Sequence, residues 1–278
     1  QGQIIVGPPG SGKSTYCAGL SQFLTELGRS FSVVNLDPAN FETQYAAEID
    51  VRDLITVEDA AVHSTLGPNG ALIFCMQFLA VNKQWLTDAV NASKSDLFLF
   101  DCPGQVELYT VSSDLKLVLK ALERDCQMKL VVVNLVDCNL CSQPANYISA
   151  CMSSLAMMVH MELPHLNVLT KIDTLANFYD SLPLSLSCYT DLQGIDQLEI
   201  ASNPKLQKLT KKLVEVIGDF SLVTFIPLAI QDKDTVLALL RQIDRALGCG
   251  FAYSEGIDEG LETERVRSLE EKYGKGVE

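Results

Sequence analysis

Short runs of apolar residues alternate along this chain with longer stretches in which apolar residues recur every three or four positions. The short runs are nearly continuous in Val, Ile, Leu and Phe, which is typical of parallel strands covered on both faces. They predict strands at residues 3–6, 31–35, 97–100, 130–136, 166–169 and 223–227. The longer stretches predict helices at residues 13–27, 53–64, 70–89, 112–123, 145–161, 205–218 and 232–247. This alternation predicts an α/β fold with a mostly parallel central sheet flanked by helices.

Two stretches interrupt the alternation. No convincing strand is found between residues 37 and 95, so a largely helical insertion is expected at residues 38–95. Residues 175–204 are rich in Ser, Asp, Leu and Pro, which predicts an irregular, lid-like insertion. We therefore expect one domain over residues 1–253. An acidic, polar tail follows at residues 254–278 and is expected to form a short helix or to be disordered.

The net charge of the chain limits the classes of partner that it can bind. The net charge is −14, from 21 basic and 35 acidic side chains, and it opposes non-specific binding to nucleic acids and anionic membranes. No apolar run is long enough to span a bilayer. The nine cysteines are scattered, and the pair Cys138 and Cys141 lacks the second pair that a zinc site needs. We therefore expect buried thiols in a reducing compartment.

A phosphate-binding motif lies near the start of the chain. Residues 7–14 read Gly-Pro-Pro-Gly-Ser-Gly-Lys-Ser and match the complete G-x-x-x-x-G-K-[ST] pattern. A predicted strand ends just before the motif and a predicted helix begins within it, as this motif requires. The alternative is a glycine-rich turn before an ordinary helix. Glycines allow the turns that point N–H groups at phosphate oxygens, and the helix start adds partial positive charge. The predicted nucleotide-binding residues here are Gly10, Ser11, Gly12, Lys13, Ser14 and Thr15.

A magnesium site is predicted beside this motif. Lys13 is expected to reach the β- and γ-phosphates, and the Ser14 hydroxyl is expected to ligate Mg²⁺. Asp101 ends a buried strand and is followed by Cys-Pro-Gly. In P-loop enzymes such an Asp holds Mg²⁺, usually through water, and the glycine (here Gly104) lets the backbone approach the γ-phosphate. The alternative is an aspartate that caps the next helix.

A guanine-reading element is predicted at residues 170–173, which read Thr-Lys-Ile-Asp after a late strand. The Asp173 carboxylate can accept hydrogen bonds from guanine N1–H and the exocyclic amine, a donor pair that adenine lacks. A site built around this carboxylate rejects adenine, because the buried charge would stay unpaired. A base-covering loop is expected after the last strand. The predicted residues of this region are Thr170, Lys171, Asp173 and Ala229.

Several segments together resemble the GPN-loop GTPases, a family of P-loop NTPases. They are Asn-Leu-Asp-Pro-Ala-Asn at residues 35–40, Gly-Pro-Asn-Gly at 67–70, Asp-Cys-Pro-Gly-Gln-Val-Glu-Leu at 101–108, and Glu-Leu-Pro-His-Leu-Asn at 162–167, which leads into 170–173. The resemblance covers residues 3–250. Residues 136–138, 188–190 and 231–234 look most similar to the type-2 eukaryotic branch, with the type-3 branch as the alternative.

The resemblance implies a dimeric GTPase that uses GTP, GDP and Mg²⁺. It implies that the loop formed by Gly67, Pro68 and Asn69 reaches across the dimer, where Asn69 stabilises the phosphate intermediate in the partner subunit. Without the family, the same three residues would predict only a turn between two helices.

The resemblance also assigns roles around the attacking water. Asp37 matches a residue near Mg²⁺ and this water, and Gln105 and Glu107 match residues that position or polarise it. With the P-loop reasoning, the predicted catalytic residues are Lys13, Asp37, Asn69, Gln105 and Glu107, and the predicted metal-binding residues are Ser14, Asp37 and Asp101.

Partners and location are implied only by the resemblance. It implies a homodimer, or a heterodimer with a paralogous GPN-loop GTPase. It implies a switch or assembly factor that acts with RNA polymerase II subunits or assembly factors, in assembly or nuclear import of the polymerase. A cytoplasmic protein that shuttles to the nucleus is expected, without direct contact to nucleic acid or membrane.

The arginine content bears on the competing functions. Between residues 13 and 173 the only arginines are Arg29, Arg52 and Arg124, and only Arg52 is a candidate to approach phosphates of its own chain. Charge neutralisation is then expected mainly from the P-loop lysine, Mg²⁺ and N–H groups. A small-molecule kinase usually carries several arginines on a lid, and residues 175–204 contain none. A non-hydrolysing, nucleotide-dependent scaffold stays open as the other alternative.

Overall fold

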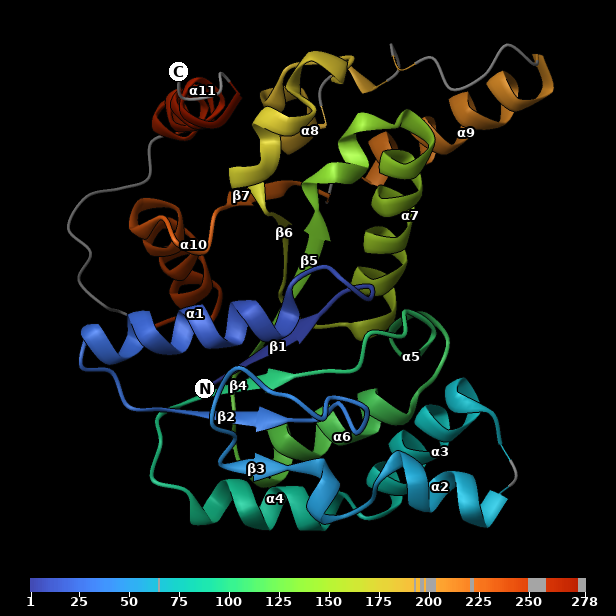
Figure 1. The fold of residues 1–278 in the computed structure, drawn as a ribbon, viewed down its shortest axis with the longest axis vertical. Coiled ribbons are helices and arrows are strands. Elements are labelled where there is room, and N and C mark those ends of the chain that lie inside the picture. The colour runs from blue at the N-terminus through green and yellow to red at the C-terminus, as the bar shows by residue number, and fades with distance from the viewer. Residues whose placement is uncertain are drawn as a thin grey trace. The chain divides into compact units, whose positions relative to one another are not determined.

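The structure is a computed structural model of the 278-residue chain, and it describes residues 1–64, 66–192, 194–195, 198, 204–220, 223–249 and 259–274 (Figure 1). The chain divides into two compact units. Unit 1 comprises Gln1–Asn134 and His160–His165, and unit 2 comprises Leu135–Val159 and Leu166–Glu278. The P-loop and Asp101 therefore belong to unit 1, whereas the guanine-reading motif belongs to unit 2.

The strands form a seven-stranded parallel sheet in the order β3-β2-β4-β1-β5-β6-β7. Every residue of β1 and of β4 is buried, which explains the nearly continuous apolar runs in the sequence. The predicted α/β class with a mostly parallel sheet is thus confirmed. The strands are β1 (Gly2–Val6), β2 (Phe31–Asn35), β3 (Ile49–Asp50), β4 (Leu97–Asp101), β5 (Leu130–Asp137), β6 (His165–Thr170) and β7 (Phe225–Leu228).

The register of the unit 1 strands brings several polar residues to one edge. Asp101, the last residue of β4, lies opposite Ile5 of β1 on one side and Asn35 of β2 on the other. On its other side β1 pairs with β5, where Val6 lies opposite Asn134. Because the carboxyl ends of parallel strands share an edge, the loops that follow β1, β2 and β4 begin side by side.

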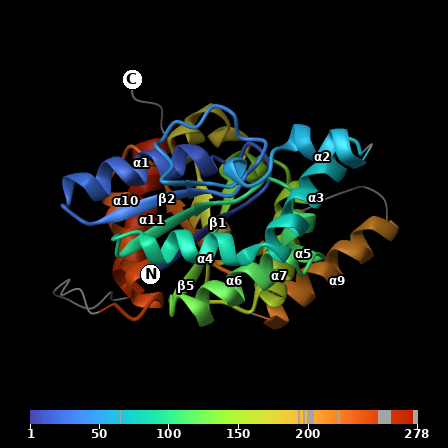
Figure 2. The same ribbon diagram turned by 90° about the horizontal axis from the view of Figure 1, so that it is seen from below.

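Helices cover both faces of the unit 1 strands. Figure 2 shows α1 on one face and α4 and α6 on the opposite face. In α6 the residues Leu115, Val118, Leu119 and Leu122 are buried, which accounts for the helical spacing of its apolar residues. The helices are α1 (Lys13–Glu26), α2 (Val57–Ser64), α3 (Pro68–Val81), α4 (Lys83–Ala92), α5 (Glu107–Thr110) and α6 (Asp114–Asp125), with the 3₁₀ helix η1 at Val51–Asp53.

The segment between β2 and β4 differs from its prediction in two respects. The expectation that it contains no strand is wrong, because β3 pairs with β2; two residues are too few to produce a pattern. The helix predicted at residues 70–89 is two helices, α3 and α4, which meet at Asn82. The Asn82 amide donates to the Phe78 carbonyl at 2.8 Å and its backbone N–H donates to the same carbonyl at 3.0 Å. These bonds end α3.

The helix predicted to start at residue 53 begins four residues later, at Val57. Thr56 is its cap: the Thr56 hydroxyl accepts the N–H of Asp59 at 3.1 Å and donates to the Asp59 carboxylate at 2.7 Å. This reciprocal pair satisfies a donor that the first helical turn leaves without a partner. The residues before it form η1 instead.

Unit 2 is built around an apolar core. The rings of Tyr147 and Tyr189 meet edge to face there, with centroids 4.8 Å apart. The strand predicted at residues 223–227 lies at Phe225–Leu228. The remaining helices are η2 (Cys138–Ser142), α7 (Pro144–Met161), η3 (Ile172–Asn177), η4 (Tyr179–Ser181), α8 (Leu186–Asp191), α9 (Pro204–Phe220), α10 (Lys233–Ala246) and α11 (Glu259–Gly274).

The predicted lid and the predicted tail both contain helices where they are described. The predicted lid at residues 175–204 contains η4 and α8, while residues 193, 196–197 and 199–203 lie outside the described part. The predicted tail contains α11, whose Val266 and Leu269 are buried in the unit 2 core; residues 254–258 and 275–278 lie outside the described part. Among the helices that the structure describes, none is both long and apolar enough to cross a bilayer.

Candidate functional site

The P-loop backbone adopts conformations that glycine reaches easily and other residues rarely do. Gly7, Gly10 and Gly12 have φ angles of 145°, 79° and 94°. Gly12 caps α1 in the left-handed conformation, and the helix begins at Lys13. The first N–H groups of a helix have no acceptor within it, and they carry the positive end of the helix dipole. The loop therefore has the chemistry of a phosphate site.

Lys13 folds back over the loop that precedes it. Its side chain is 8% exposed, and Nζ donates to the carbonyls of Gly7 at 3.2 Å and Pro8 at 3.3 Å. Burial lowers the pKa of Lys13, while the attraction of Asp101 and Asp37 acts to raise it. Two carboxylates thus help to keep a positive charge beside the P-loop.

Gly104 packs directly on this lysine. A Cβ atom at position 104 would lie 3.3 Å from Lys13 Nζ, 3.2 Å from Pro9 Cγ and 3.3 Å from Pro9 Cα. Such distances are shorter than ordinary contacts, so the segment after Asp101 approaches the P-loop as closely as glycine permits.

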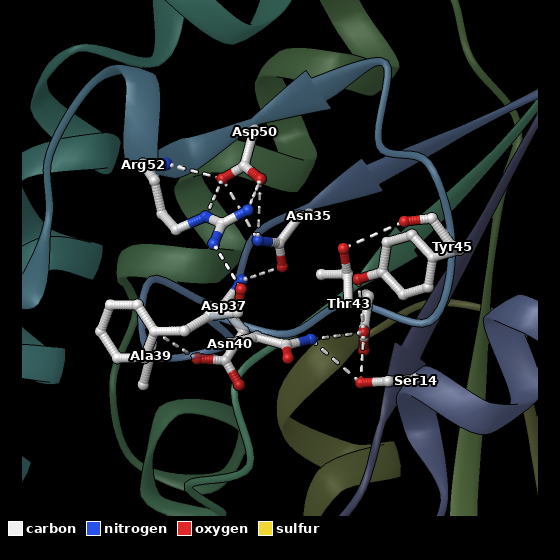
Figure 3. Close-up of polar contacts among 11 residues, drawn as sticks. Ser14, Asn35, Asp37, Ala39, Asn40, Thr43, Tyr45, Asp50 and Arg52 are labelled. Carbon is white, nitrogen blue, oxygen red and sulfur yellow. Dashed lines mark hydrogen bonds and ion pairs between the residues drawn. The ribbon is translucent and has the colours of Figure 1, made fainter.

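Asp101 lies at the centre of a polar cluster. Its Oδ2 atom accepts hydrogen bonds from the Tyr45 hydroxyl at 2.7 Å and the Ser14 hydroxyl at 2.8 Å. Asn40 Nδ2 donates to Ser14 Oγ at 3.0 Å and lies 3.5 Å from the same carboxylate oxygen. Figure 3 shows Ser14, Asn40 and Tyr45 turned towards this one point, from α1 and from the loop after β2.

The two oxygens of Asp101 have different surroundings. The residue is 1% exposed, and its Oδ1 atom is buried without a hydrogen-bond partner among the described residues. Burial raises the pKa of Asp101, and the hydrogen bonds from Tyr45 and Ser14 and the charge of Lys13 act to lower it. An unpartnered buried carboxylate oxygen is costly, so this atom has the properties of one that awaits a ligand.

The residues present fit magnesium. Mg²⁺ prefers oxygen ligands, keeps several waters and takes few side chains from the protein. The Ser14 hydroxyl and Asp101 Oδ1 supply oxygens of this kind, and Asp37 carries a second carboxylate nearby in the loop after β2. Among the described residues no group of three or more His, Cys, Asp and Glu side chains could hold a metal ion. The cluster therefore suits a cation that is bound jointly by the protein, water and phosphate.

Asp37 is held where the loop leaves β2. Its N–H donates to Asn35 Oδ1 at 3.1 Å, and its own Oδ1 accepts the N–H of Ala39 at 3.0 Å. Burial raises the pKa of Asp37, and the Ala39 hydrogen bond and Lys13 act to lower it. The Asn35 amide in turn donates to both carboxylate oxygens of Asp50, at 3.2 Å each. The position of Asp37 is thus coupled to β3.

Arg52 completes this network and is not an arginine finger here. Its Nε and Nη2 atoms donate to the two oxygens of Asp50 at 2.9 and 2.5 Å, and Nη1 donates to the Phe41 carbonyl at 3.3 Å. Burial acts to raise the pKa of Asp50, but the hydrogen bonds from Arg52 and Asn35 lower it. The guanidinium therefore holds the middle of the loop after β2 through the Phe41 carbonyl, and Figure 3 shows it facing the Asp50 carboxylate.

One of the residues assigned to the attacking water, Gln105, contacts the Gly-Pro-Asn segment. Gly67 caps α3, Pro68 begins it, and Asn69 is exposed in its first turn. Gln105 Nε2 donates to Asn69 Oδ1 at 3.1 Å, within one chain. Glu107 is exposed at the start of α5. No sequence pattern predicts the contact between Asn69 and Gln105, which are 36 residues apart.

In unit 2 the guanine-reading motif has a fixed backbone. Thr170 Oγ1 donates to the Val136 carbonyl at 3.1 Å. Lys171 is left-handed, with φ 61°, and its Nζ pairs with Asp137 at 2.7 Å. The Cys138 thiol donates to the Lys171 carbonyl at 3.1 Å. The motif is therefore held by the end of β5 and by η2.

The two remaining predicted base contacts of unit 2 differ in exposure. Asp173 is exposed in the first turn of η3, so its carboxylate is accessible to a ligand. Ala229 is 2% exposed, and its N–H and carbonyl both bond to the Thr235 hydroxyl, at 3.2 and 2.7 Å. The side chain of Ala229 is thus buried, and only the backbone of its loop is left to line a site.

Sequence reasoning missed one residue of the cluster altogether. Tyr45 belongs to no motif and lies in a stretch where no element is predicted, so no pattern marks it. Asn40 lies in the segment at residues 35–40 that resembles the family, and the resemblance assigns it no role. Their contacts with Ser14 and Asp101 span 26 to 61 residues, and they become visible only in the fold.

Comparisons with known proteins show which family this chain resembles over most of its length. A family model described as "Conserved hypothetical ATP binding protein" matches residues 5–249. GPN-loop GTPase QQT1 of Arabidopsis thaliana is 43% identical over 291 residues, covering 98% of this chain and 96% of that protein. GPN-loop GTPase 2 of Danio rerio is 43% identical, covering 90% of this chain and 81% of that protein. GPN-loop GTPase 2 of Saccharomyces cerevisiae is 42% identical, with coverages of 91% and 76%.

A solved structure shares the fold. The crystal structure of a GTPase from Pyrococcus abyssi in its apo form matches with a TM-score of 0.73 and 20% sequence identity, covering 90% of this chain and 98% of that chain. Several relatives at 40–43% identity carry the type-2 name, which confirms the predicted branch. The family model and these relatives, together with the P-loop and the Gly-Pro-Asn segment, show that the chain belongs to the GPN-loop GTPase family.

Proposed function

We propose that this chain binds GTP and hydrolyses it to GDP and phosphate in a Mg²⁺-dependent reaction. The observation that carries the proposal is the cluster beside the P-loop, where the Lys13 ammonium and the Ser14 hydroxyl accompany an Asp101 oxygen that has no partner among the described residues. Each of these groups suits one part of a nucleoside triphosphate with its bound Mg²⁺. The relatives named as GTPases add independent support.

The chain's own residues supply charge and position. The P-loop N–H groups and Lys13 would hold the β- and γ-phosphates, and electrostatic stabilisation of this kind is the main source of catalysis in phosphoryl transfer. Ser14 and Asp101, with Asp37 beside them, would hold the magnesium ion. When bound, this ion neutralises charge that develops on the phosphate oxygens. Arg52 is engaged by Asp50, so no arginine between residues 13 and 173 is proposed to assist.

Three side chains are proposed to orient the attacking water. The Asp37 carboxylate is fixed by the N–H of Ala39 at 3.0 Å, so it can accept a hydrogen bond from a water molecule beside the phosphates. Gln105 and Glu107 come from the segment that also carries Gly104, which packs on the P-loop. A water held by such groups would be positioned for in-line attack on the γ-phosphate without any covalent intermediate.

Guanine is the proposed base. The exposed Asp173 carboxylate can pair with the N1–H and amine of guanine, and the Lys171 backbone before it is locked by the thiol of Cys138. A rigid loop improves discrimination, because it cannot move to satisfy the wrong base. The chain is therefore proposed to prefer GTP to ATP, although the matching family model is described as an ATP-binding protein.

A dimer is proposed, formed either with a second copy or with a paralogous GPN-loop GTPase. Unit 1 exposes several large apolar side chains on α2 and α3, between these helices and after α5, and exposed apolar surface of this kind is found at protein contacts. They are Val62 (79% exposed), Leu66 (40%), Phe78 (37%), Val81 (83%) and Val111 (76%). We further propose that Asn69 acts on the phosphates of the partner subunit. A dimer that covers these apolar side chains would bring the exposed Asn69 to the partner subunit.

The wider role is proposed from the resemblance to the family. We propose a nucleotide-dependent switch or assembly factor for RNA polymerase II or its import, in the cytoplasm and, by shuttling, in the nucleus. The exchange between GTP and GDP would act through the loop after β2 and the helices beyond it, because this loop carries Asp37 and Asn40.

Phosphate release by the purified chain tests the central proposal. GTP with Mg²⁺ should give continuous phosphate release, and Lys13→Ala should abolish it. GTP binding without release would instead support the non-hydrolysing scaffold. A larger thermal stabilisation by ATP than by GTP would support the small-molecule kinase. Lys208→Ala, on the exposed surface of α9, is a matched control that should behave as the native chain.

A further inference from the structure

Tyr45 is a buried tyrosine that bonds to a carboxylate of the magnesium cluster. It lies between β2 and β3, is 8% exposed, and donates its hydroxyl to Asp101 Oδ2 at 2.7 Å. Burial and the charge of Asp101 raise the pKa of Tyr45 far above its ordinary value, so the hydroxyl keeps its proton and acts as a donor. A buried tyrosine needs some partner for its hydroxyl. Here that partner is the one carboxylate at the end of β4.

The hydrogen bond decides which carboxylate oxygen is left for a ligand. Oδ2 already receives the hydroxyls of Tyr45 and Ser14, and Asn40 Nδ2 lies at 3.5 Å from it. Oδ1 is buried and has no partner among the described residues. Because the carboxylate cannot rotate without breaking two short hydrogen bonds to Oδ2, the orientation of Oδ1 is fixed. Bonds to a charged carboxylate are the stronger class of hydrogen bond.

The same residue ties the loop after β2 to this carboxylate. The loop contains Asp37 and Asn40, and Arg52 holds its middle through the Phe41 carbonyl. Tyr45 fixes its far end. A displacement of Asp101 would therefore move the loop, and a displacement of the loop would move the carboxylate.

We propose that Tyr45 is a positioning residue for magnesium. It holds Asp101 so that Oδ1 faces the hydrated cation, and it couples the loop that carries Asp37 to the occupancy of the metal site. The inference rests on the proposed function, since it presupposes Mg²⁺ at Ser14 and Asp101. It adds a residue that no sequence motif of the site contains.

Tyr45→Phe tests the inference, because it removes one oxygen atom and leaves the ring in place. The rate at which a fluorescent GDP analogue dissociates is measured against Mg²⁺ concentration in the intact chain. We expect the Mg²⁺ concentration for half-maximal slowing of dissociation to rise about tenfold, in line with the loss of one hydrogen bond to a charged group. In EDTA the dissociation rate should stay within about twofold of the native rate, because the phosphate contacts are untouched.

Tyr16→Phe is the matched control. Tyr16 is also buried in unit 1 and donates its hydroxyl to Gln3 Oε1 at 2.9 Å, a neutral acceptor outside the cluster. This variant should lose stability without a change in Mg²⁺ dependence. If Tyr45→Phe behaves in the same way, Tyr45 is only a core residue and the inference is wrong.

Rescue separates positioning from packing. Incorporation of 4-aminophenylalanine at position 45 restores an N–H donor at the site of the hydroxyl, and it should recover most of the native Mg²⁺ dependence. A native chain whose GDP dissociation ignores Mg²⁺ would refute the proposed function itself, and the inference with it. A normal native response combined with an unchanged response in Tyr45→Phe would refute the inference alone.

Discussion

At the scale of single residues, the close contact between Gly104 and the P-loop leaves no room for a methyl group. Substitution by alanine therefore tests whether the contact matters. A Cβ atom there would crowd the Lys13 ammonium and the backbone of Pro9, and the backbone cannot yield without moving the phosphate site. We expect Gly104→Ala to lower kcat/KM for GTP hydrolysis roughly tenfold, the cost of an overpacked contact in a site that must keep its geometry. Phosphate release by the purified chain measures this effect.

The control for this substitution is another glycine. Gly218 lies near the end of α9, and a Cβ atom there would meet nothing within 4 Å. Gly218→Ala should leave turnover unchanged and stabilise the helix slightly, because alanine has the higher helix propensity. Native turnover in Gly104→Ala would mean that the close approach has no part in the reaction.

Residues of the site were predictable where their signal is local. The P-loop and Asp101 were found because a short motif, a preceding strand and a following helix are all contiguous in sequence. The sequence indicates Arg52 as a candidate arginine finger, because an aspartate two positions away does not by itself predict an ion pair; the structure shows that Asp50 neutralises it. Tyr45 and the contact between Gln105 and Asn69 were not predictable, because they depend on which loops the sheet brings together.

At the scale of elements, helix α11 is attached to two segments of unit 2. Asp232, the cap of α10, accepts hydrogen bonds from Lys272 at 2.7 Å and Tyr273 at 2.8 Å. Glu270 accepts the N–H of Leu186, at the start of α8, at 3.1 Å and the hydroxyl of Tyr179 at 3.2 Å. The helix thus connects the loop after β7 with the segment after the guanine-reading motif.

Leu269 anchors this helix in the core and gives a test of its importance. The side chain is 6% exposed, so Leu269→Ala should lower the free energy of unfolding by about 2–5 kcal/mol. It should also speed hydrogen exchange in η3 and α8, because α11 packs on both. Urea unfolding and hydrogen exchange of the intact chain measure the two effects.

The control for Leu269 is a leucine on another helix surface. Leu209 of α9 is 53% exposed, and Leu209→Ala should change stability by no more than about 0.5 kcal/mol. Unchanged exchange in η3 and α8, despite a destabilised Leu269→Ala variant, would show that α11 does not support these segments.

Elements were predictable in proportion to their length and regularity. The long helices and the buried strands of four or more residues were found because their periodicity extends over many positions. The two-residue strand β3 and the break at Asn82 were missed, since a strand that short has no period and a single side-chain cap interrupts an otherwise apolar stretch. The helix α11 was expected only as a short tail element, because its composition is polar and its two buried anchors are few.

At the scale of the whole molecule, unit 1 exposes large apolar side chains although the chain carries a net charge of −14. Such exposed side chains favour a chain that works with a partner over one that works alone. Val62 on α2 is 79% exposed and Val81 at the end of α3 is 83% exposed, and the Gly-Pro-Asn segment lies at the start of α3. The structure contains an in-chain partner for Asn69, namely Gln105, so two mechanisms are open. Asn69 acts either on its own site through Gln105 or on the site of a partner subunit.

Mixing two inactive variants distinguishes these mechanisms. Asn69→Ala should bind GTP normally and turn over slowly, whereas Lys13→Ala should lack a working phosphate site but keep Asn69. If Asn69 acts in trans, mixed dimers contain one complete site, because the Lys13→Ala subunit supplies Asn69 to its partner. Half of randomly mixed dimers are mixed, each with one working site of two, so an equimolar mixture should recover about a quarter of native turnover.

The outcome of the mixing experiment depends on exchange of subunits, which the mass of tagged and untagged chains reports directly. With exchange established, a mixture as inactive as its components would show that Asn69 serves its own chain through Gln105. Gln105→Ala then provides the decisive comparison. If Asn69 acts only through Gln105, the double variant should be no slower than either single one, because the two losses remove the same interaction. If Asn69 acts in trans while Gln105 orients water, their effects on kcat should multiply.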